Sequence, residues 1–118
     1  MMKYQTMPTT SSFGLVLTTA ATPDEGRLLA RTLVEERLAA CVTLIPAVES
    51  IYRWKETIES SAETLLLIKT SHDQLPALQS RLHALHSYTL PEFLVLDVDA
   101  ESSSHPYIEW LQDSLRNP

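Results

Sequence analysis

Side chains that could bind a metal ion are few in this sequence of 118 residues, which has one cysteine, Cys41, and four histidines. A structural zinc site in one chain needs four ligands, and neither a Cys-x-x-Cys pair nor a His-Glu-x-x-His motif is present to supply them. His83 and His86 are three residues apart, so on a helix their side chains face the same way. With Cys41 or a carboxylate they form a candidate site for one ion. The alternative is a solvated helix end, where a histidine interacts favourably with the helix dipole.

Motifs of catalysis or cofactor binding are largely missing from the sequence. Only two glycines are present, so there is no glycine-rich phosphate loop, and no Gly-x-Ser-x-Gly elbow occurs. Asp97, Asp99 and Glu101 have the spacing that opens a calcium loop, but the glycine and the distal glutamate of such a loop are absent. A dyad of Cys41 with a histidine stays open as a catalytic alternative, although no third, orienting residue is placed beside it. We therefore predict that the protein is not an enzyme.

A set of aromatic and charged residues stands at predicted strand ends and at the start of the last predicted helix. Side chains of these types line clefts that bind a cation or a small anion, and they also form polar contact surfaces between subunits. Both interpretations stay open, and we favour the subunit contact. The members of the set are Tyr52, Trp54, Lys69, Tyr88, Glu92, Tyr107 and Trp110.

Composition and charge exclude several classes of partner. The 9 basic and 15 acidic residues give a net charge of −6, and no run of lysine or arginine occurs, so we predict no nucleic-acid or membrane surface. No stretch approaches the ~20 apolar residues of a membrane span. A single cysteine cannot form an intrachain disulfide, which favours a cytoplasmic location. The length predicts one domain over residues 13–118, after a disordered tail at 1–12.

The helices and strands that must position these side chains are predicted from the periodicity of apolar residues and from the prolines and capping residues between them. Apolar, β-branched runs predict strands at 13–19, 41–54 and 58–70, with a bulge or kink where Pro46 interrupts the second, and a fourth at 92–97. Helical spacing predicts helices near 23–37, 75–85 and 105–115, capped at Thr22, Ser71 and Ser104 or His105. The order is β-α-β-β-α-β plus a C-terminal helix. This order is typical of the ferredoxin-like split βαβ fold in the α+β class.

Two features of the predicted sheet call for a partner. Residues 65–68 are an unbroken apolar run, which is typical of a strand buried on both faces, whereas the helices cover one face. The second and third strands are long, so we expect their hairpin to project with Ile51, Tyr52 and Trp54 exposed on it. We therefore predict association through strand edges and the open sheet face; the alternative is that the helices cover the whole patch.

Several segments, in order along nearly the whole chain, resemble the signature of the CutA family. They combine apolar strand residues with less common pairs of aromatic and charged residues. The segments are 36–42 (Glu-Arg-Leu-Ala-Ala-Cys-Val), 45–46 (Ile-Pro), 50–55 (Ser-Ile-Tyr-Arg-Trp-Lys), 65–70 (Leu-Leu-Leu-Ile-Lys-Thr), 86–88 (His-Ser-Tyr), 90–92 (Leu-Pro-Glu) and 107–111 (Tyr-Ile-Glu-Trp-Leu).

The resemblance implies a ferredoxin-like protomer in a tight, PII-like homotrimer whose long hairpins join neighbouring sheets. It implies a role in tolerance to divalent cations, copper above all, with Cys41 and His86 as metal ligands. The alternative implication is a PII-like module that binds a small effector or a partner without a physiological metal. In either case the resemblance places an intersubunit cleft near Trp54, Lys69, Tyr88, Glu92, Tyr107 and Trp110.

This sequence departs from the family pattern at several positions. Glycines are usual where Ala47 and Glu56 stand, and a proline is frequent where Ser87 stands. Some members carry a cysteine shortly after the first strand, where this chain has residues 18–21 (Thr-Thr-Ala-Ala). Without that thiol, a site for copper has one soft ligand fewer.

Overall fold

Four strands and three α-helices follow one another in the predicted order in the computed structural model, which describes residues 12–116. The strands are β1 (Phe13–Ala20), β2 (Cys41–Trp54), β3 (Thr57–Ser71) and β4 (Leu94–Asp97). The helices are α1 (Pro23–Glu35), α2 (Leu75–Leu85) and α3 (His105–Ser114), and a 3₁₀ turn, η2 (His72–Gln74), precedes α2. The predicted tail, apart from Ser12, lies outside the described residues.

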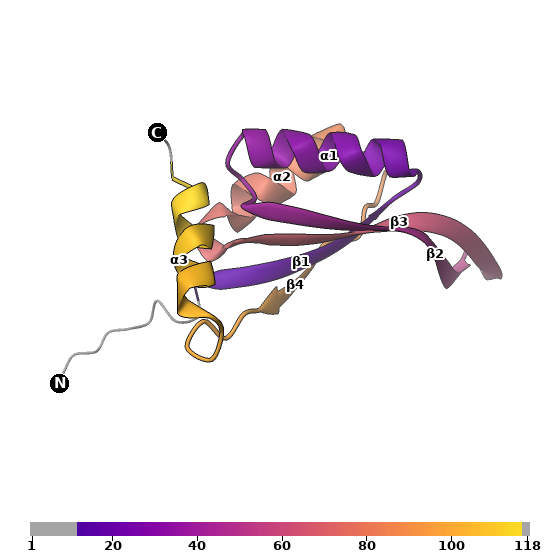
Figure 1. Ribbon diagram of the computed structural model, residues 1–118. Coiled ribbons are helices and arrows are strands. Elements are labelled where there is room, and N and C mark those ends of the chain that lie inside the picture. Colours follow the sequence, from indigo (N-terminus) through magenta and orange to yellow (C-terminus); the bar gives the residue numbers. More distant parts are fainter. Residues whose placement is uncertain (1–11, 117–118) are drawn as a thin grey trace.

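The strands form one antiparallel sheet in the order β2-β3-β1-β4. Helices α1 and α2 lie on one face of this sheet, and α3 lies at the end of the sheet where β1 begins (Figure 1). The predicted ferredoxin-like α+β fold is therefore confirmed. Within residues 12–116, no helix is both long enough and apolar enough to cross a membrane.

The main core lies between the sheet and helices α1 and α2. Side chains alternate along a strand, so every second residue of β1 and β3 faces the helices. Burying one such aliphatic side chain contributes about 2 kcal/mol. The fully or almost fully buried members of this core include Val16, Leu66 and Ile68 from the strands and Leu29, Leu33, Leu78 and Leu82 from the helices.

The opposite face of the sheet is open. Leu65 and Leu67 alternate with the buried Leu66 and Ile68 and are only half-buried, so the helices leave one face of residues 65–68 uncovered, as predicted, and the alternative that they cover the whole patch is wrong. The reason is that α1 and α2 cover only the other face (Figure 1). The apolar residues of the edge strand β4 are also exposed, with Leu94 at 57%. The open face is therefore apolar and without cover from these helices.

The start of α2 differs from the prediction. Ser71 makes no capping hydrogen bond with its side chain, and the chain passes through η2 before α2 begins at Leu75. Pro76 explains the shift, because a residue without an N–H fits in the first turn of a helix and is unfavourable further inside.

The β2–β3 hairpin projects beyond the sheet, as predicted. Ala20, the last residue of β1, pairs with Thr64, so residues 48–63 of the hairpin have no neighbour in β1 (Figure 1). The register of β2 against β3 shifts between Ile45 and Val48, which confirms the predicted bulge at Pro46. The hairpin is thus an arm of two strands, attached to the sheet at one end.

Three non-glycine residues of this hairpin have left-handed backbone conformations. Ala47 in the bulge has a φ of 61°, and Lys55 and Glu56 in the turn have φ values of 49° and 69°. Two successive residues with positive φ form a type I′ turn, which matches the twist of a hairpin and favours glycine. Ala47 and Glu56 stand where the resemblance places glycines. Both residues therefore adopt a left-handed conformation that glycine adopts without strain and that a side chain makes unfavourable.

We expect Glu56→Gly to stabilise the protein by about 1 kcal/mol, because the left-handed conformation costs a side chain roughly that much. The measurement is thermal unfolding at a fixed protein concentration, in which the midpoint rises by a few degrees. Glu59→Gly is the matched control, since Glu59 lies in an extended part of β3, where glycine lowers the midpoint. A lower midpoint for Glu56→Gly would contradict the strain argument.

Candidate functional site

A cavity of about 750 Å³ lies between the β2–β3 hairpin and the loop that joins α2 to β4. We call it the hairpin cleft. It combines aromatic rings, hydroxyl groups and two carboxylates. Its lining residues are Thr19, Ser50, Ile51, Tyr52, Trp54, Ser61, Glu63, Ser87, Tyr88, Thr89, Leu90 and Glu92.

The charge of the hairpin cleft is negative. Glu63 is buried, with 9% of its surface exposed, whereas Glu92 is exposed. Although Glu92 is exposed, neighbouring groups remove part of the water around its carboxylate, and this desolvation, together with the charge of Glu63, raises the pKa of Glu92. Among the residues that line the cleft, none is a lysine or an arginine. No basic side chain of the lining therefore balances the charge of the two carboxylates, and such an arrangement attracts a cation.

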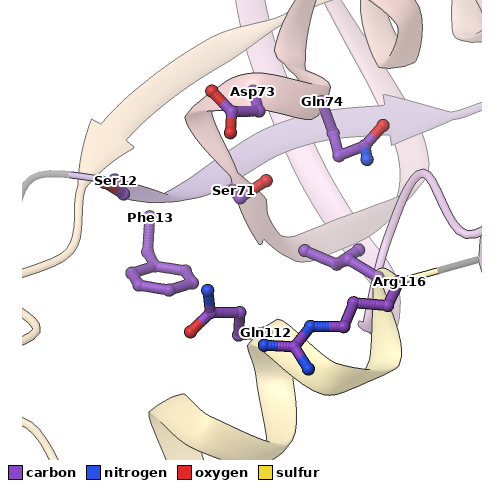
Figure 2. A pocket seen from close by; sticks show the side chains of 8 residues that line it. Ser12, Phe13, Ser71, Asp73, Gln74, Gln112 and Arg116 are labelled. Carbon is purple, nitrogen blue, oxygen red and sulfur yellow. The ribbon is translucent and has the colours of Figure 1, made fainter. Parts of the chain in front are cut away.

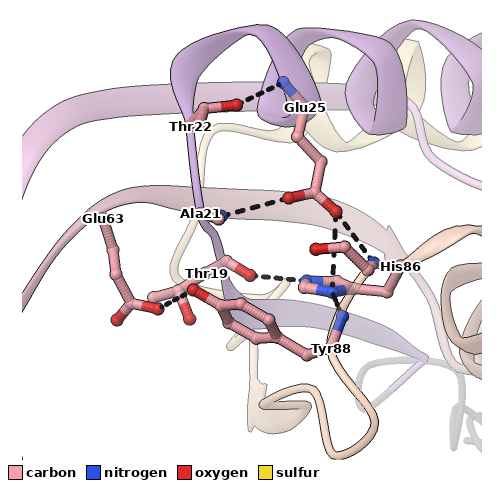
Figure 3. Close-up of polar contacts among 8 residues, drawn as sticks. Thr19, Ala21, Thr22, Glu25, Glu63, His86 and Tyr88 are labelled. Atoms are coloured by element: carbon pink, nitrogen blue, oxygen red, sulfur yellow. Dashed lines mark hydrogen bonds and ion pairs between the residues drawn. The ribbon is translucent and has the colours of Figure 1, made fainter.

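Tyr88 connects the loop to the hairpin. Its hydroxyl donates a hydrogen bond of 2.7 Å to Oε2 of Glu63 (Figure 3). Burial, followed by this bond and the charge of Glu63, raises the pKa of Tyr88 well above its usual range. The phenol therefore stays protonated and acts as a donor, which fixes one oxygen of the buried carboxylate.

His86 holds the loop against β1. Its ring is 0% exposed, Nε2 lies 2.7 Å from the carbonyl oxygen of Thr19, and the backbone N–H of Tyr88 donates to Nδ1 over 3.0 Å (Figure 3). A carbonyl only accepts and an N–H only donates, so these contacts assign a neutral ring with its proton on Nε2. Both nitrogens are engaged, and a metal ion could bind His86 only after one of these bonds breaks.

Glu25 anchors the same loop to α1. Thr22 caps this helix by accepting a bond from the N–H of Glu25, and the Glu25 carboxylate accepts from the N–H groups of Ala21 and Ser87 (Figure 3). Burial acts in the opposite direction, but hydrogen bonds from Ser87 and Ala21 lower the pKa of Glu25. The predicted capping pattern at Thr22 therefore also positions one wall of the hairpin cleft.

The two histidines predicted to face the same way do not do so. His83 is exposed in the last turn of α2, whereas His86 is buried and has an extended backbone, with φ −75° and ψ 144°. The prediction is wrong because α2 ends at Leu85, so the helical spacing does not reach His86.

Cys41 and His86 have separate surroundings. Cys41 pairs with Lys69 across β2 and β3, and its sulfur lies 3.7 Å from Nζ of Lys69. His86 instead contacts Thr19, whose partner on β3 is Leu65. In the region 12–116, no group of three or more His, Cys, Asp or Glu side chains is arranged to hold a metal ion. Shared metal binding by Cys41 and His86 stays a prediction.

The residues predicted for an intersubunit cleft fall into two groups. Trp54, Tyr88 and Glu92 line the hairpin cleft. Tyr107 and Trp110 instead belong to α3, and their tilted rings contact each other with centroids 5.3 Å apart. This helix lies at the end of the sheet away from the hairpin (Figure 1). Lys69 does not line the cleft either; its Nζ donates to Oγ1 of Thr43 over 2.7 Å. One chain therefore brings together half of the predicted set.

Glu63 is the main residue that the sequence analysis missed. A glutamate in a strand usually points into solvent, and its burial here depends on the loop that folds over the hairpin. One signal was available: Glu63 stands two residues before Leu65, so alternation places both on the open face of β3.

A second cavity, of about 300 Å³, lies between α3 and the start of β1 (Figure 2). Its lining includes Phe13, Asp73, Gln112 and Arg116, and the guanidinium of Arg116 lies 3.3 Å from the carboxylate of Asp113. None of the residues predicted for a metal site or an intersubunit cleft lines this cavity. We therefore take the hairpin cleft as the candidate functional site.

Comparisons with known proteins agree with this architecture. A family model described as "CutA1 divalent ion tolerance protein" matches residues 14–114. The chain is 41% identical to the divalent-cation tolerance protein CutA of Thermus thermophilus, over 85% of this chain and 95% of that protein. It is 39% identical to the chloroplastic protein CutA of Arabidopsis thaliana, of which it spans 56%. The structure of the "PII-like protein CutA from Nostoc sp. PCC 7120 in apo form" is 41% identical, with a TM-score of 0.81 and coverage of 87% of this chain and 97% of that one.

Proposed function

This chain belongs to the CutA1 divalent ion tolerance family, and from that premise we propose that it is a binding protein that takes up divalent cations in the hairpin cleft. The observation that carries the proposal is the pair of carboxylates, Glu63 and Glu92, in a cleft whose lining has no basic residue. Desolvation and the nearby charge of Glu63 raise the pKa of Glu92, and a divalent ion would offset the repulsion between these two carboxylates. The proposed role is binding and not catalysis.

The chemistry of the cleft favours hard cations. Carboxylate and hydroxyl oxygens suit Mg²⁺, Ca²⁺ and Mn²⁺, while copper prefers sulfur and imidazole ligands. Glu63 and Glu92 supply two carboxylates, Ser61 supplies a hydroxyl, and water completes the coordination. Copper binding by Cys41 and His86 stays a prediction, as does a cytoplasmic location.

The proposal includes a homotrimer, which the open sheet face supports. The two groups of predicted cleft residues lie at opposite ends of the sheet, one at the hairpin and one on α3. In a head-to-tail ring, the hairpin end of one subunit meets the α3 end of the next. Such a ring would bring Tyr107 and Trp110 of one subunit toward Trp54 of its neighbour. It would also cover the half-buried Leu65 and Leu67. A trimer therefore accounts for both the divided cleft and the apolar face.

Cation binding is tested by calorimetric titration with Mn²⁺ and Mg²⁺. We expect the double variant Glu63→Gln/Glu92→Gln to lose more than about tenfold in affinity, because the amides keep the shape of the cleft without its charge. Glu49→Gln, a change of an exposed carboxylate on the opposite face of the same hairpin, is the matched control and keeps the affinity of the unmodified protein. Unchanged Mn²⁺ affinity in the double variant would exclude the hairpin cleft as the cation site.

A further inference from the structure

We infer that the hairpin cleft is built for an aliphatic diammonium ion, an organic divalent cation with two amino groups joined by a short methylene chain. The inference rests on the proposed function, because it names a ligand class for the same site. It is supported by the room in the cleft, by its aromatic rings and by the different burial of its two carboxylates.

The hairpin cleft is larger than a metal ion requires. Six water-sized ligands of about 30 Å³ each occupy about 180 Å³, and this is the coordination shell of an octahedral ion such as Mg²⁺. The cleft has a volume of about 750 Å³, which lies in the range of sites for small organic molecules. The cleft therefore has room for an organic cation together with its remaining water of hydration.

Aromatic rings supply what an organic ammonium group needs and a metal ion does not. Trp54 and Tyr52 from the hairpin are 52% and 42% exposed, and Tyr88 lines the cleft from the loop. Among the described residues, no aromatic ring packs against Trp54 or Tyr52. The faces of tryptophan and tyrosine attract ammonium ions, and these apolar rings also pack on methylene groups. A cleft lined by both half-exposed rings and carboxylates therefore suits an alkylammonium ion.

The two carboxylates differ in depth, which favours two positive charges on one ligand. Glu63 is buried, with one oxygen held by the Tyr88 hydroxyl, and Glu92 is exposed on the loop. One ammonium group would bind at Glu63 inside the cleft, while the second would bind at Glu92. No lysine or arginine among the lining residues competes for either position, so the ligand itself supplies the positive charge.

The test is calorimetric titration of the full chain with 1,4-diaminobutane, alongside n-butylamine and 1,4-butanediol as ligands of matched length. We expect the diamine to bind, the monoamine to bind at least tenfold more weakly, and the diol to give no binding. Trp54→Leu should weaken diamine binding about 5- to 30-fold through loss of the cation–π interaction. Ile58→Ala, at an exposed apolar residue of the same hairpin outside the cleft, should leave it unchanged.

Three results would overturn the inference: no binding of the diamine, binding of n-butylamine as tight as that of the diamine, or diamine affinity that Trp54→Leu leaves intact. Titration of the same samples with Mn²⁺ separates this failure from failure of the proposed function. Mn²⁺ binding that depends on Glu63 and Glu92, without diamine binding, would leave the proposed function standing and remove the diammonium ligand. Diamine binding that depends on Trp54, without Mn²⁺ binding, would keep the diammonium site and remove the metal ion.

Discussion

Leu67→Asp is expected to abolish the proposed trimer and to leave a monomer at micromolar concentration. Leu67 lies in the middle of the open face, where it pairs with Leu17 on β1 and Thr43 on β2. In a trimer that covers this face, the substitution would place three unpaired carboxylates in apolar surroundings. Burying one such charge costs several kcal/mol, and protonating it instead also costs free energy at neutral pH.

Sedimentation velocity measures this outcome directly. The unmodified protein should have a mass three times that of the 13.3 kDa chain, and the variant should have the mass of one chain. Leu28→Asp is the matched control, because Leu28 is 66% exposed on α1, on the covered side of the sheet, and should keep the trimer. A trimer of the Leu67→Asp variant, or a monomer of the unmodified protein, would refute assembly through the open face.

Loss of assembly should also lower stability. The isolated chain leaves Leu94, Val95 and Leu96 of the edge strand β4 exposed, and an exposed apolar edge strand favours aggregation. Stability of such a chain depends on protein concentration, since each association step removes apolar surface from water. We expect the unfolding midpoint of the unmodified protein to rise with concentration and that of Leu67→Asp to stay constant.

The fold could be predicted from local signals. Pro46 cannot donate to a sheet, and the bulge lies beside it. The apolar spacing of α1 and the capping threonine at its start specify the helix, apart from its last residues. These features depend on residues near one another in the sequence, which is why periodicity and turn chemistry suffice to find them.

The candidate site was only partly predictable because it depends on contacts between distant residues. Tyr88 and Glu92, which were predicted for an intersubunit cleft, line the hairpin cleft of one chain, but Glu63 joins them only through a bond to Tyr88, 25 residues later. Lys69 was predicted for the same intersubunit cleft, and within one chain the register of β3 places it beside Cys41, away from the hairpin cleft. Strand register and loop placement are set by the whole fold and not by local sequence.

His86→Ala is expected to destabilise the protein by about 3 kcal/mol. It removes the partners of the Thr19 carbonyl and of the Tyr88 N–H, and leaving a buried polar group without a partner costs about 1–3 kcal/mol. It also opens a cavity where a fully buried ring stood. Urea unfolding at a fixed protein concentration measures the loss, which should be accompanied by weaker cation binding because Tyr88 and Glu92 are no longer positioned.

If His86 is instead a copper ligand together with Cys41, a different result is expected. A double-mutant cycle of these two residues distinguishes this role from a positioning role of His86. Without metal, Cys41→Ala should cost less than about 1 kcal/mol, and its effect should add to that of His86→Ala, because the two residues share no contact within the chain. If copper(II) bridges them, within one subunit or between two, it stabilises the unmodified protein and the two effects stop being additive. Additive effects with and without copper(II) would assign His86 a positioning role: it holds Tyr88, and through Tyr88 the buried carboxylate of Glu63, in the hairpin cleft.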